Sequence, residues 1–129
     1  MKAIAVNGSP RKGWNTDMLL QQALKGAADA GAETELIQLS DLKFSGCRSC
    51  FACKRAGAET GRCMWKDDLQ PVFDKMLAAD AVFMGSPIYL GNVSGMMYCL
   101  ASRDPCGEPQ SPDIRAATLH RRAGGLLLL

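Results

Sequence analysis

The sequence lacks a long apolar segment. The four leucines at 126–129 fall far short of the roughly 20 apolar residues that a membrane-spanning helix needs. The mostly apolar start of the chain, residues 1–6, is followed by the polar residue Asn7. This run is too short to form the apolar core of a signal peptide. We therefore expect no membrane partner and a cytoplasmic location.

The sequence also has only one histidine and no large excess of positive or negative charge. The 15 Lys and Arg residues and 13 Asp and Glu residues give a net charge of +2, and the basic residues are scattered. Because nucleic-acid-binding domains gather such residues in a patch or stripe, we expect no nucleic-acid partner. The single histidine, His120, is expected to pack or to face solvent. No Ser/His/Asp set is therefore predicted.

The length of 129 residues predicts one domain, and its first third reads as a βαβ unit. Residues 3–6 form an apolar run without alternation, which is typical of a buried parallel strand. An apolar stripe at helical spacing begins near Asp17, and Asn15 or Thr16 is placed to cap that helix. The second strand is predicted at 35–39. A strand, a helix and a strand in this order predict a parallel, right-handed start to the sheet.

The middle of the chain predicts two more helices and a third strand. Residues 69–77 carry the clearest amphipathic stripe, and Asp67 and Gln70 are spaced as a capping box for it. Residues 81–84 are expected to form the third strand. Ser94 is placed to cap a third helix.

The pattern changes in residues 102–129. Prolines interrupt any long element there. Residues 114–119 are consistent with one or two helical turns, and residues 123–129 with a fourth strand or its beginning. This segment is expected to be either a long connection or an unrelated tail.

The stretch at 7–16, which we call the anion loop, predicts an anion-binding turn. The start of the following helix offers unpaired N–H groups and the positive end of its dipole. Gly8 and Gly13 allow the backbone to approach a ligand closely. The loop adds hydroxyl, amide and cationic side chains, which belong to Ser9, Arg11, Lys12, Asn15 and Thr16. It matches neither G-x-x-x-x-G-K-S/T nor G-x-G-x-x-G, so neither a nucleoside triphosphate nor a Rossmann dinucleotide is expected. The alternative is a charged surface turn.

The stretch at 85–94, the second loop, follows the third strand. It combines flat apolar surface, backbone amides and an aromatic ring, which suits a tricyclic ring system. Open α/β sheets bind ligands beyond the carboxyl ends of their strands, at the switch point between the first and third strands. The two loops are therefore predicted to meet over one crevice. The alternative for the second loop is a Pro-Gly turn that contributes to the core.

Both loops carry a resemblance to a known family. The anion loop, Asn7-Gly8-Ser9-Pro10-Arg11-Lys12-Gly13-Trp14-Asn15-Thr16, resembles the FMN phosphate loop of the NADPH-dependent FMN reductase and iron-sulfur flavoprotein families. The second loop, Gly85-Ser86-Pro87-Ile88-Tyr89-Leu90-Gly91-Asn92-Val93-Ser94, resembles the loop that lies against the flavin ring in those families. The resemblance covers roughly residues 1 to 100.

The resemblance implies an α/β, flavodoxin-like three-layer sandwich. Such a sheet has five strands in the order 2-1-3-4-5, whereas this sequence supplies three, the beginning of a fourth and no fifth. We therefore expect the order 2-1-3(-4), incomplete at the C-terminal edge. Residues 1–129 would be one FMN-binding domain in a chain truncated at its C-terminus, with 102–129 as an atypical or truncated tail.

The resemblance also assigns the cofactor residues. It implies that Ser9, Arg11, Asn15 and Thr16 hold the phosphate, and that Lys12 and Gly13 contribute backbone or electrostatic field. Trp14 is expected to cover the helix start. The flavin ring would be lined by Ser86, Pro87, Ile88, Tyr89, Leu90, Gly91, Asn92 and Val93. The resemblance further implies a homo-oligomer in which the flavin and a neighbouring subunit share a site.

Six cysteines in a chain expected in the cytoplasm favour metal or redox chemistry over disulfides. Four of them follow the pattern C-x2-C-x2-C-x9-C, namely Cys47, Cys50, Cys53 and Cys63. Four thiolates at this spacing can hold zinc or an Fe-S cluster. The pattern resembles the 4Fe-4S cluster motif of iron-sulfur flavoproteins, in which the fourth cysteine follows more closely. An Fe-S cluster, zinc and free thiols all remain open. Cys99 is expected in the core, and Cys106 lies in the tail.

The sequence therefore predicts an FMN-binding oxidoreductase. Electrons would pass from NAD(P)H through FMN to an unidentified small-molecule or protein acceptor, with a cysteine-bound cluster as one open route. No catalytic side chain is expected, because the cofactor accepts the hydride. One alternative is a metal-binding or electron-carrier module without turnover. The other is a truncated product that cannot hold flavin.

Overall fold

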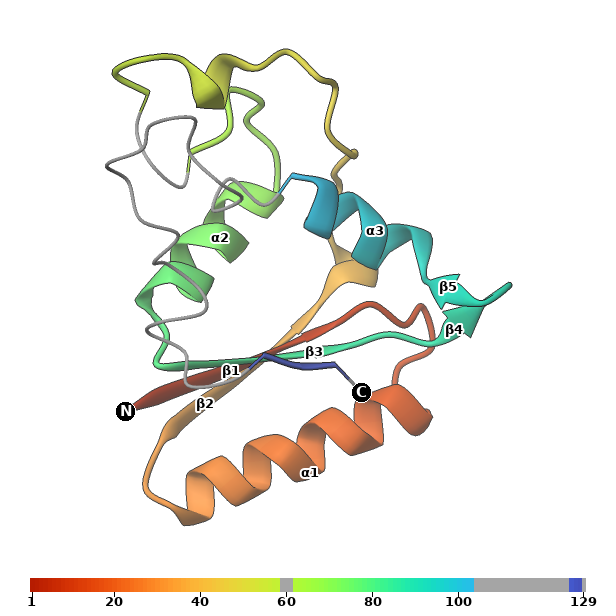
Figure 1. The fold of residues 1–129 in the computed structure, drawn as a ribbon. Coiled ribbons are helices and arrows are strands. Elements are labelled where there is room, and N and C mark those ends of the chain that lie inside the picture. Colours follow the sequence, from red (N-terminus) through yellow and green to blue (C-terminus); the bar gives the residue numbers. More distant parts are fainter. Residues whose placement is uncertain (59–61, 104–125, 129) are drawn as a thin grey trace.

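A four-stranded parallel sheet lies at the centre of the computed structural model, which describes residues 1–58, 62–103 and 126–128 (Figure 1). The strand order is β2-β1-β3-β6. These strands are β1 (Lys2–Asn7), β2 (Glu33–Gln38), β3 (Ala81–Gly85) and β6 (Leu126–Leu128). Helix α1 (Asn15–Asp29) covers one face, and α2 (Leu69–Ala78) and α3 (Gly95–Ser102) cover the other. The predicted three layers and the order 2-1-3 are confirmed.

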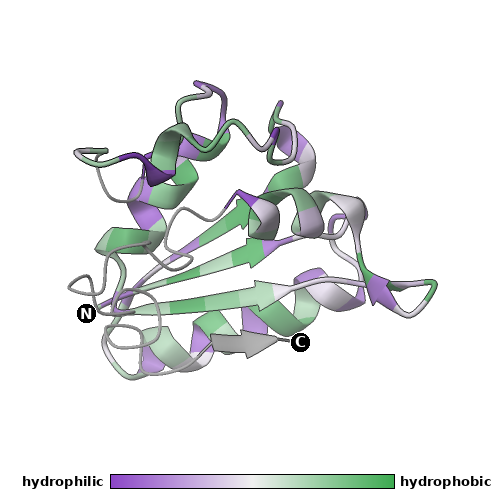
Figure 2. Ribbon diagram, turned by 45° about the horizontal axis from the view of Figure 1, so that its top comes forward, coloured by the Kyte–Doolittle hydropathy of each residue, from purple (hydrophilic) through white to green (hydrophobic). Residues whose placement is uncertain are grey.

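Strand β1 is the centre of the core, and its two faces carry side chains of different size. Ala3 and Ala5 pack against Leu20 and Leu24 of α1. On the opposite face, Ile4 and Val6 belong to the larger cluster, which also contains buried residues of α2 and α3. Figure 2 shows the resulting apolar strands between more polar helix surfaces. The alternation follows from the pleat of a strand, which sends successive side chains to opposite faces.

Of the three predicted helix caps, the one on α1 is wrong, the one on α2 is formed in part and the one on α3 is confirmed. Asn15 and Thr16 lie inside α1, whose N-cap position is Trp14 without a side-chain cap. The helix begins earlier than predicted because the Asp17 carboxylate already accepts the Gly13 N–H.

The capping box on α2 is formed only in part. Its N-cap position is Asp68, and the Gln70 side chain accepts the Cys63 N–H at 3.2 Å. Asp67 Oδ1 does accept the N–H of Leu69, the first residue of α2, at 3.1 Å, and the same carboxylate also forms an ion pair with Arg103. The predicted cap on α3 is confirmed, since Ser94 Oγ accepts the Met97 N–H at 3.2 Å.

The second loop contains a small antiparallel hairpin of β4 (Ile88–Tyr89) and β5 (Asn92–Val93). Its turn residues Leu90 and Gly91 have φ values of 49° and 78°. Positive φ at both central positions is the geometry of the tight turns that suit the twist of a hairpin. The hairpin projects beyond the sheet at the carboxyl ends of β1 and β3 (Figure 1).

Strand β6 pairs in parallel with β3 from Val82 to Met84, which confirms the beginning of a fourth strand. The helical turns predicted at 114–119, together with Cys106 and His120, lie outside the described residues. Within the part of the chain that the structure describes, no helix has both the length and the apolar character needed to cross a bilayer.

Candidate functional site

Two hydrogen bonds join the anion loop to the second loop, and a third lies within the second loop itself. Gly8 N–H donates to Gly85 O at 2.8 Å. Ser94 Oγ donates to Gly8 O at 2.6 Å, and Ser94 N–H donates to Ser86 Oγ at 2.8 Å. The structure therefore brings the two loops together at the carboxyl ends of neighbouring strands, where the sequence predicts a shared crevice.

Two glycines allow the helices to approach these strand ends. A Cβ on Gly85 would lie 2.8 Å from Leu20 Cδ1 and 2.9 Å from Thr16 Cγ2, both in α1. A Cβ on Gly8 would lie 3.0 Å from Met97 Cβ in α3. Cβ atoms essentially never lie less than 3.0 Å from another atom and seldom lie at 3.0–3.4 Å, so glycine is required at position 85 and favoured at position 8 for the two helix starts to converge here.

The first turn of the anion loop is fixed from inside by Ser9 and Asn7. Ser9 is 4% exposed, its N–H donates to Asn7 Oδ1 at 2.8 Å, and its hydroxyl accepts the Arg11 N–H at 3.1 Å. Asn7 Nδ2 is buried and has no acceptor among the described residues. Ser9 therefore shapes the turn, and its predicted contact with a ligand stays a prediction.

The start of α1 is anchored by the buried side chain of Asp17. Its carboxylate accepts the Gly13 N–H at 2.5 Å and the Gln38 Nε2 group at 3.1 Å. The predicted ligands Asn15 and Thr16 lie in the same turn, exposed and half-buried respectively. Because no side chain caps this helix, its first N–H groups and the side chain of Asn15 are available to an anion.

The two cations of the anion loop are engaged with neighbouring side chains. Lys12 Nζ pairs with Asp41 at 2.6 Å, in the short helix η1 (Leu39–Asp41). The Arg11 guanidinium lies 5.2 Å from the centroid of the Trp14 ring. Trp14 itself is 59% exposed, so it covers the helix start less than the sequence predicts. Both cations contribute positive field at the loop.

The hairpin of the second loop presents uncovered apolar side chains. Ile88 is 79% exposed, Tyr89 is 46% exposed and Leu90 is fully exposed. Pro87 and Val93, at its base, are half-buried. Exposed apolar side chains gathered on one short hairpin are typical of a surface that a ligand or another chain covers.

The cysteine loop, residues 45–67, lies over α2 and α3 (Figure 1) and contains one short helix, η2 (Ala52–Lys54). The thiol groups of all four predicted ligands are free. Cys47 and Cys50 are exposed, and Cys53 and Cys63 are half-buried. Cys99 is half-buried as well, so its predicted core position is wrong.

These thiols have the right chemistry for zinc or an Fe-S cluster, but they are not gathered around one point. Within the described residues, no three His, Cys, Asp or Glu side chains are close enough to share a metal ion. In this arrangement the cysteine loop does not fit a metal or cluster, and no electron-transfer step is assigned to it.

Arg103 closes the cysteine loop, and the sequence gives no signal for this role. Its side chain is 2% exposed, and its guanidinium donates to Ser45 O at 3.1 Å, to Trp65 O at 3.1 Å and to the Asp67 carboxylate. Burial acts to raise the pKa of the Asp67 carboxyl, but the hydrogen bonds from Arg103 and the Leu69 N–H outweigh it and lower that pKa.

The same balance acts on the arginine. Burial acts to lower the pKa of Arg103, but hydrogen bonding with Asp67 and with the Cys63 side chain raises it above its ordinary value. Cys63 therefore lies beside a fixed positive charge, unlike the exposed Cys47 and Cys50.

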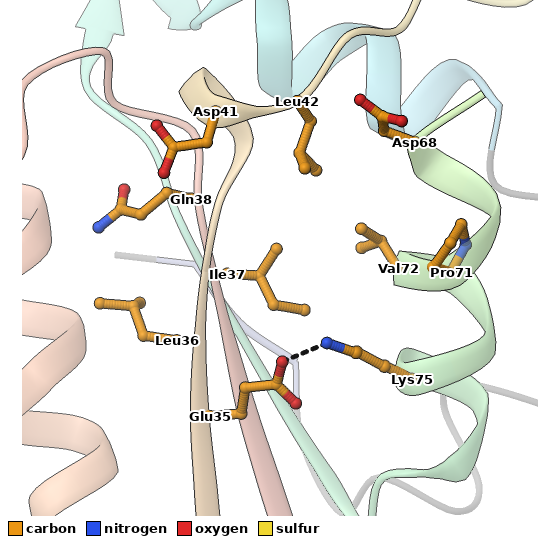
Figure 3. Close-up of a pocket in the computed structure, with 10 residues that line it drawn as sticks. All are labelled: Glu35, Leu36, Ile37, Gln38, Asp41, Leu42, Asp68, Pro71, Val72 and Lys75. Carbon is orange, nitrogen blue, oxygen red and sulfur yellow. Dashed lines mark hydrogen bonds and ion pairs between the residues drawn. The ribbon is translucent and has the colours of Figure 1, made fainter.

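A separate groove of about 360 Å³ runs along the outer edge of β2, facing α2 (Figure 3). Ile37, Leu42 and Val72 give it an apolar wall, and the ion pair of Lys75 with Glu35 crosses one end. None of the predicted cofactor residues lines it. This groove is distinct from the junction of the two loops.

Comparisons with known proteins identify the family of the chain. The model of the NADPH-dependent FMN reductase family matches residues 1–100. An iron-sulfur flavoprotein of Methanocaldococcus jannaschii is 41% identical over 103 residues, which are 80% of this chain and 51% of that protein. An iron-sulfur flavoprotein of Archaeoglobus fulgidus is also 41% identical over 103 residues, covering 80% of this chain and 48% of that protein. The chain thus spans about half the length of these curated relatives.

Solved structures give the same fold. A flavone reductase aligns with a TM-score of 0.61 and 27% identity over 80% of this chain and 29% of its own. RosB, crystallised with a bound 8-demethyl-8-formylriboflavin-5'-phosphate intermediate, aligns with a TM-score of 0.69 and 21% identity over 99% of this chain and 51% of its own. The second match supports the fold alone. With the family match over residues 1–100, these findings show that the chain belongs to the NADPH-dependent FMN reductase family.

Proposed function

We propose that the chain binds FMN between the anion loop and the second loop and acts as a flavin-dependent oxidoreductase. The observation that carries this proposal is the direct hydrogen bonding of the two loops beside an uncapped helix start. One end of the crevice offers N–H donors and positive field, and the other offers flat apolar surface. FMN has a phosphate at one end and a tricyclic ring at the other, so the residues present fit it.

The chain's own residues would bind and orient the cofactor. The first N–H groups of α1 and the side chains of Asn15 and Thr16 would bind the phosphate. Arg11 and Lys12 would add positive field. Pro87 and Tyr89 would lie against the ring, whose edge the backbone amides of the hairpin would meet. When bound, FMN would supply the chemistry of hydride transfer and of single-electron transfer.

Electrons are proposed to come from NAD(P)H and to leave to a small-molecule or protein acceptor. The support for the donor is the name of the family, NADPH-dependent FMN reductase. Because the curated relatives are about twice as long as this chain, the donor and the acceptor are proposals for it. The exposed hairpin supports a homo-oligomer, because a second copy could cover Ile88 and Leu90.

The relatives' name suggests one further role for the cysteine loop, which is to hold an Fe-S cluster. The four thiols would have to come together from their described positions to do so. Analysis of iron and acid-labile sulfide in anaerobically purified protein tests this role. Protein with neither, which binds zinc or nothing, would contradict it.

FMN titration tests the main proposal. Purified protein should quench FMN fluorescence and take on a bound-flavin absorption spectrum, and NADPH or NADH should then bleach it. Asn15→Ala should weaken binding about three- to tenfold through the loss of one hydrogen bond to phosphate. Gln22→Ala, an exposed change further along α1, is the matched control. Protein that takes up no FMN would contradict the proposal, and bound FMN that neither nucleotide reduces would favour a carrier without turnover.

A further inference from the structure

The contacts of Arg103 bring together two points that are far apart in the chain. Its Nη1 atom donates to Ser45 O, 58 residues away, and its Nη2 atom donates to Trp65 O, 38 residues away. These acceptors stand near the two ends of the cysteine loop. One guanidinium therefore closes the loop, which contains Cys47, Cys50, Cys53 and Cys63 between its ends.

The last turn of α3 makes a second connection to the start of the same loop. Cys47 N–H donates to Ser102 Oγ at 3.2 Å, and that hydroxyl donates to Cys99 O at 2.9 Å. A Cβ on Gly46 would lie 3.4 Å from Cys99 Sγ, so the loop backbone rests directly on α3. The end of α3 thus supports the loop through a side chain at 102 and another at 103.

The loop has little else of regular structure to hold it. In its described residues, 45–58 and 62–67, the regular element is the three-residue helix η2. Ser49 and Phe51 have φ values of 52° and 55°, a region that such residues seldom adopt. The arrangement of the thiols therefore depends on contacts from outside the loop, and Arg103 supplies three of them.

We propose that Arg103 is the positioning residue of the cysteine loop, and that its bridge between Ser45, Trp65 and Asp67 sets where Cys47 and Cys63 lie. The bridge needs the forked donors of a guanidinium. An ammonium group is a point charge and cannot reach acceptors at both ends of the loop at the same time. The proposal concerns the thiols themselves. It stands whether or not the loop carries a metal and whether or not the crevice binds FMN.

Hydrogen exchange measures this role directly. The amides of Cys47 and Cys63 are bonded to Ser102 Oγ and Gln70 Oε1, so their protection reports on loop closure. In Arg103→Gln we expect exchange in peptides containing these residues to accelerate about tenfold, since at least one buried hydrogen bond is lost. Arg103→Lys should accelerate it similarly, although the charge is kept.

Arg48→Gln is the matched control. Arg48 belongs to the same loop, is exposed, and lies 4.2 Å from the Trp65 ring centroid, so its replacement removes a charge without opening the bridge. Exchange in β1 and α1 should stay at the wild-type rate in all three variants. Unchanged exchange at Cys47 and Cys63 in Arg103→Gln, or full protection in Arg103→Lys, would overturn the proposal. So would acceleration that extends through β1 and α1, because Arg103 would then brace the whole fold.

FMN titration of the same variants separates this proposal from the proposed function. Wild-type protein that binds no FMN overturns the flavin site and leaves the exchange result standing. Variants that exchange faster in the cysteine loop and still bind FMN within twofold of wild type support both.

Discussion

The proposed crevice between the two loops and the cysteine loop are held in opposite ways. The junction of the two loops is built from backbone and small side chains: Gly8 and Gly85 let two helices approach, and Ser94 joins the loops. The cysteine loop depends on one long side chain, Arg103, that reaches it from a different element. The short motifs of both regions are therefore visible in the sequence, whereas the distant side chain that holds the cysteine loop is not.

The largest expected effect is at the crevice. Gly85→Ala places a Cβ within 2.9 Å of Leu20 and Thr16, so α1 must move away from β3. We expect a loss of about 2–3 kcal/mol in the free energy of unfolding, as for overpacked cores, and a loss of FMN binding. Denaturant unfolding and flavin titration measure the two.

Gly26→Ala is the control for that substitution. A Cβ there meets nothing within 4 Å, and Gly26 lies inside α1, so alanine should stabilise the helix by about 0.5–1 kcal/mol. If Gly85→Ala is as well tolerated as Gly26→Ala, then the close backbone approach does not define the crevice.

A smaller effect is expected at the junction of the two loops. Ser94→Ala removes the cap on Met97 N–H and the donor to Gly8 O. We expect a cost of about 1–2 kcal/mol, the range for a lost cap and an unsatisfied buried acceptor. Ser40→Ala, at an exposed position, should change the unfolding free energy by less than about 0.5 kcal/mol. Equal effects of the two substitutions would show that the crevice loops are not held through Ser94.

Low pH should weaken the contacts that hold the cysteine loop. The pKa of the folded Asp67 carboxyl lies below its ordinary value of 3.8, so the unfolded chain takes up the proton more readily. The stability that this carboxylate contributes is complete above about pH 5 and falls as the pH drops through the folded pKa.

Hydrogen exchange across the acid range below about pH 5, corrected for the intrinsic rate, should show the cysteine loop losing protection before β1. Asp67→Asn should remove that step in the pH dependence, because the amide has no charge to lose. A loop that keeps its protection at the acid end of the range would mean that the ion pair with Arg103 does not hold the loop. The same conclusion would follow if the Asp67→Asn protein and the wild type gave identical pH profiles.

The smallest effect is expected on the exposed ion pair of the anion loop. Lys12 and Asp41 are each about half exposed, and such pairs contribute roughly 0–1 kcal/mol. Lys12→Ala should leave thermal unfolding almost unchanged and weaken FMN binding about twofold, an effect that added salt should reduce. A loss of binding greater than about tenfold would make Lys12 a direct phosphate ligand.

Much of the fold could be predicted from local patterns. The stripe at Leu69, Val72, Phe73 and Met76 is buried as its spacing indicates, and the apolar run of β1 is buried on both faces. The caps of α1 and α2 could not be fully predicted, because several polar residues near each helix start compete for the same N–H groups. Tertiary partners decide between them: Asp67 accepts from both the Leu69 N–H and Arg103, and the Gln70 side chain accepts the Cys63 N–H.

The candidate site follows the same division. The two loops were predictable because each is one short segment beside a strand end. The contacts of Ser9, Arg11 and Lys12 with Asn7, Trp14 and Asp41 could not be predicted, because they depend on the folded loop, and the predicted cofactor roles of these three residues stay predictions. Arg103 was missed because its acceptors lie 36 to 58 residues away. No local period encodes such a contact.

Helix α3 sets the distance between the two sites. Ser94 at its start serves the crevice, and Arg103 after its end closes the cysteine loop. Its eight residues set a spacing of roughly 12 Å, at about 1.5 Å per residue. A one-residue insertion would rotate Arg103 by about 100° away from its acceptors, whereas a substitution that keeps the length would not. The length of this helix is therefore constrained from both ends, independently of the side chains along it.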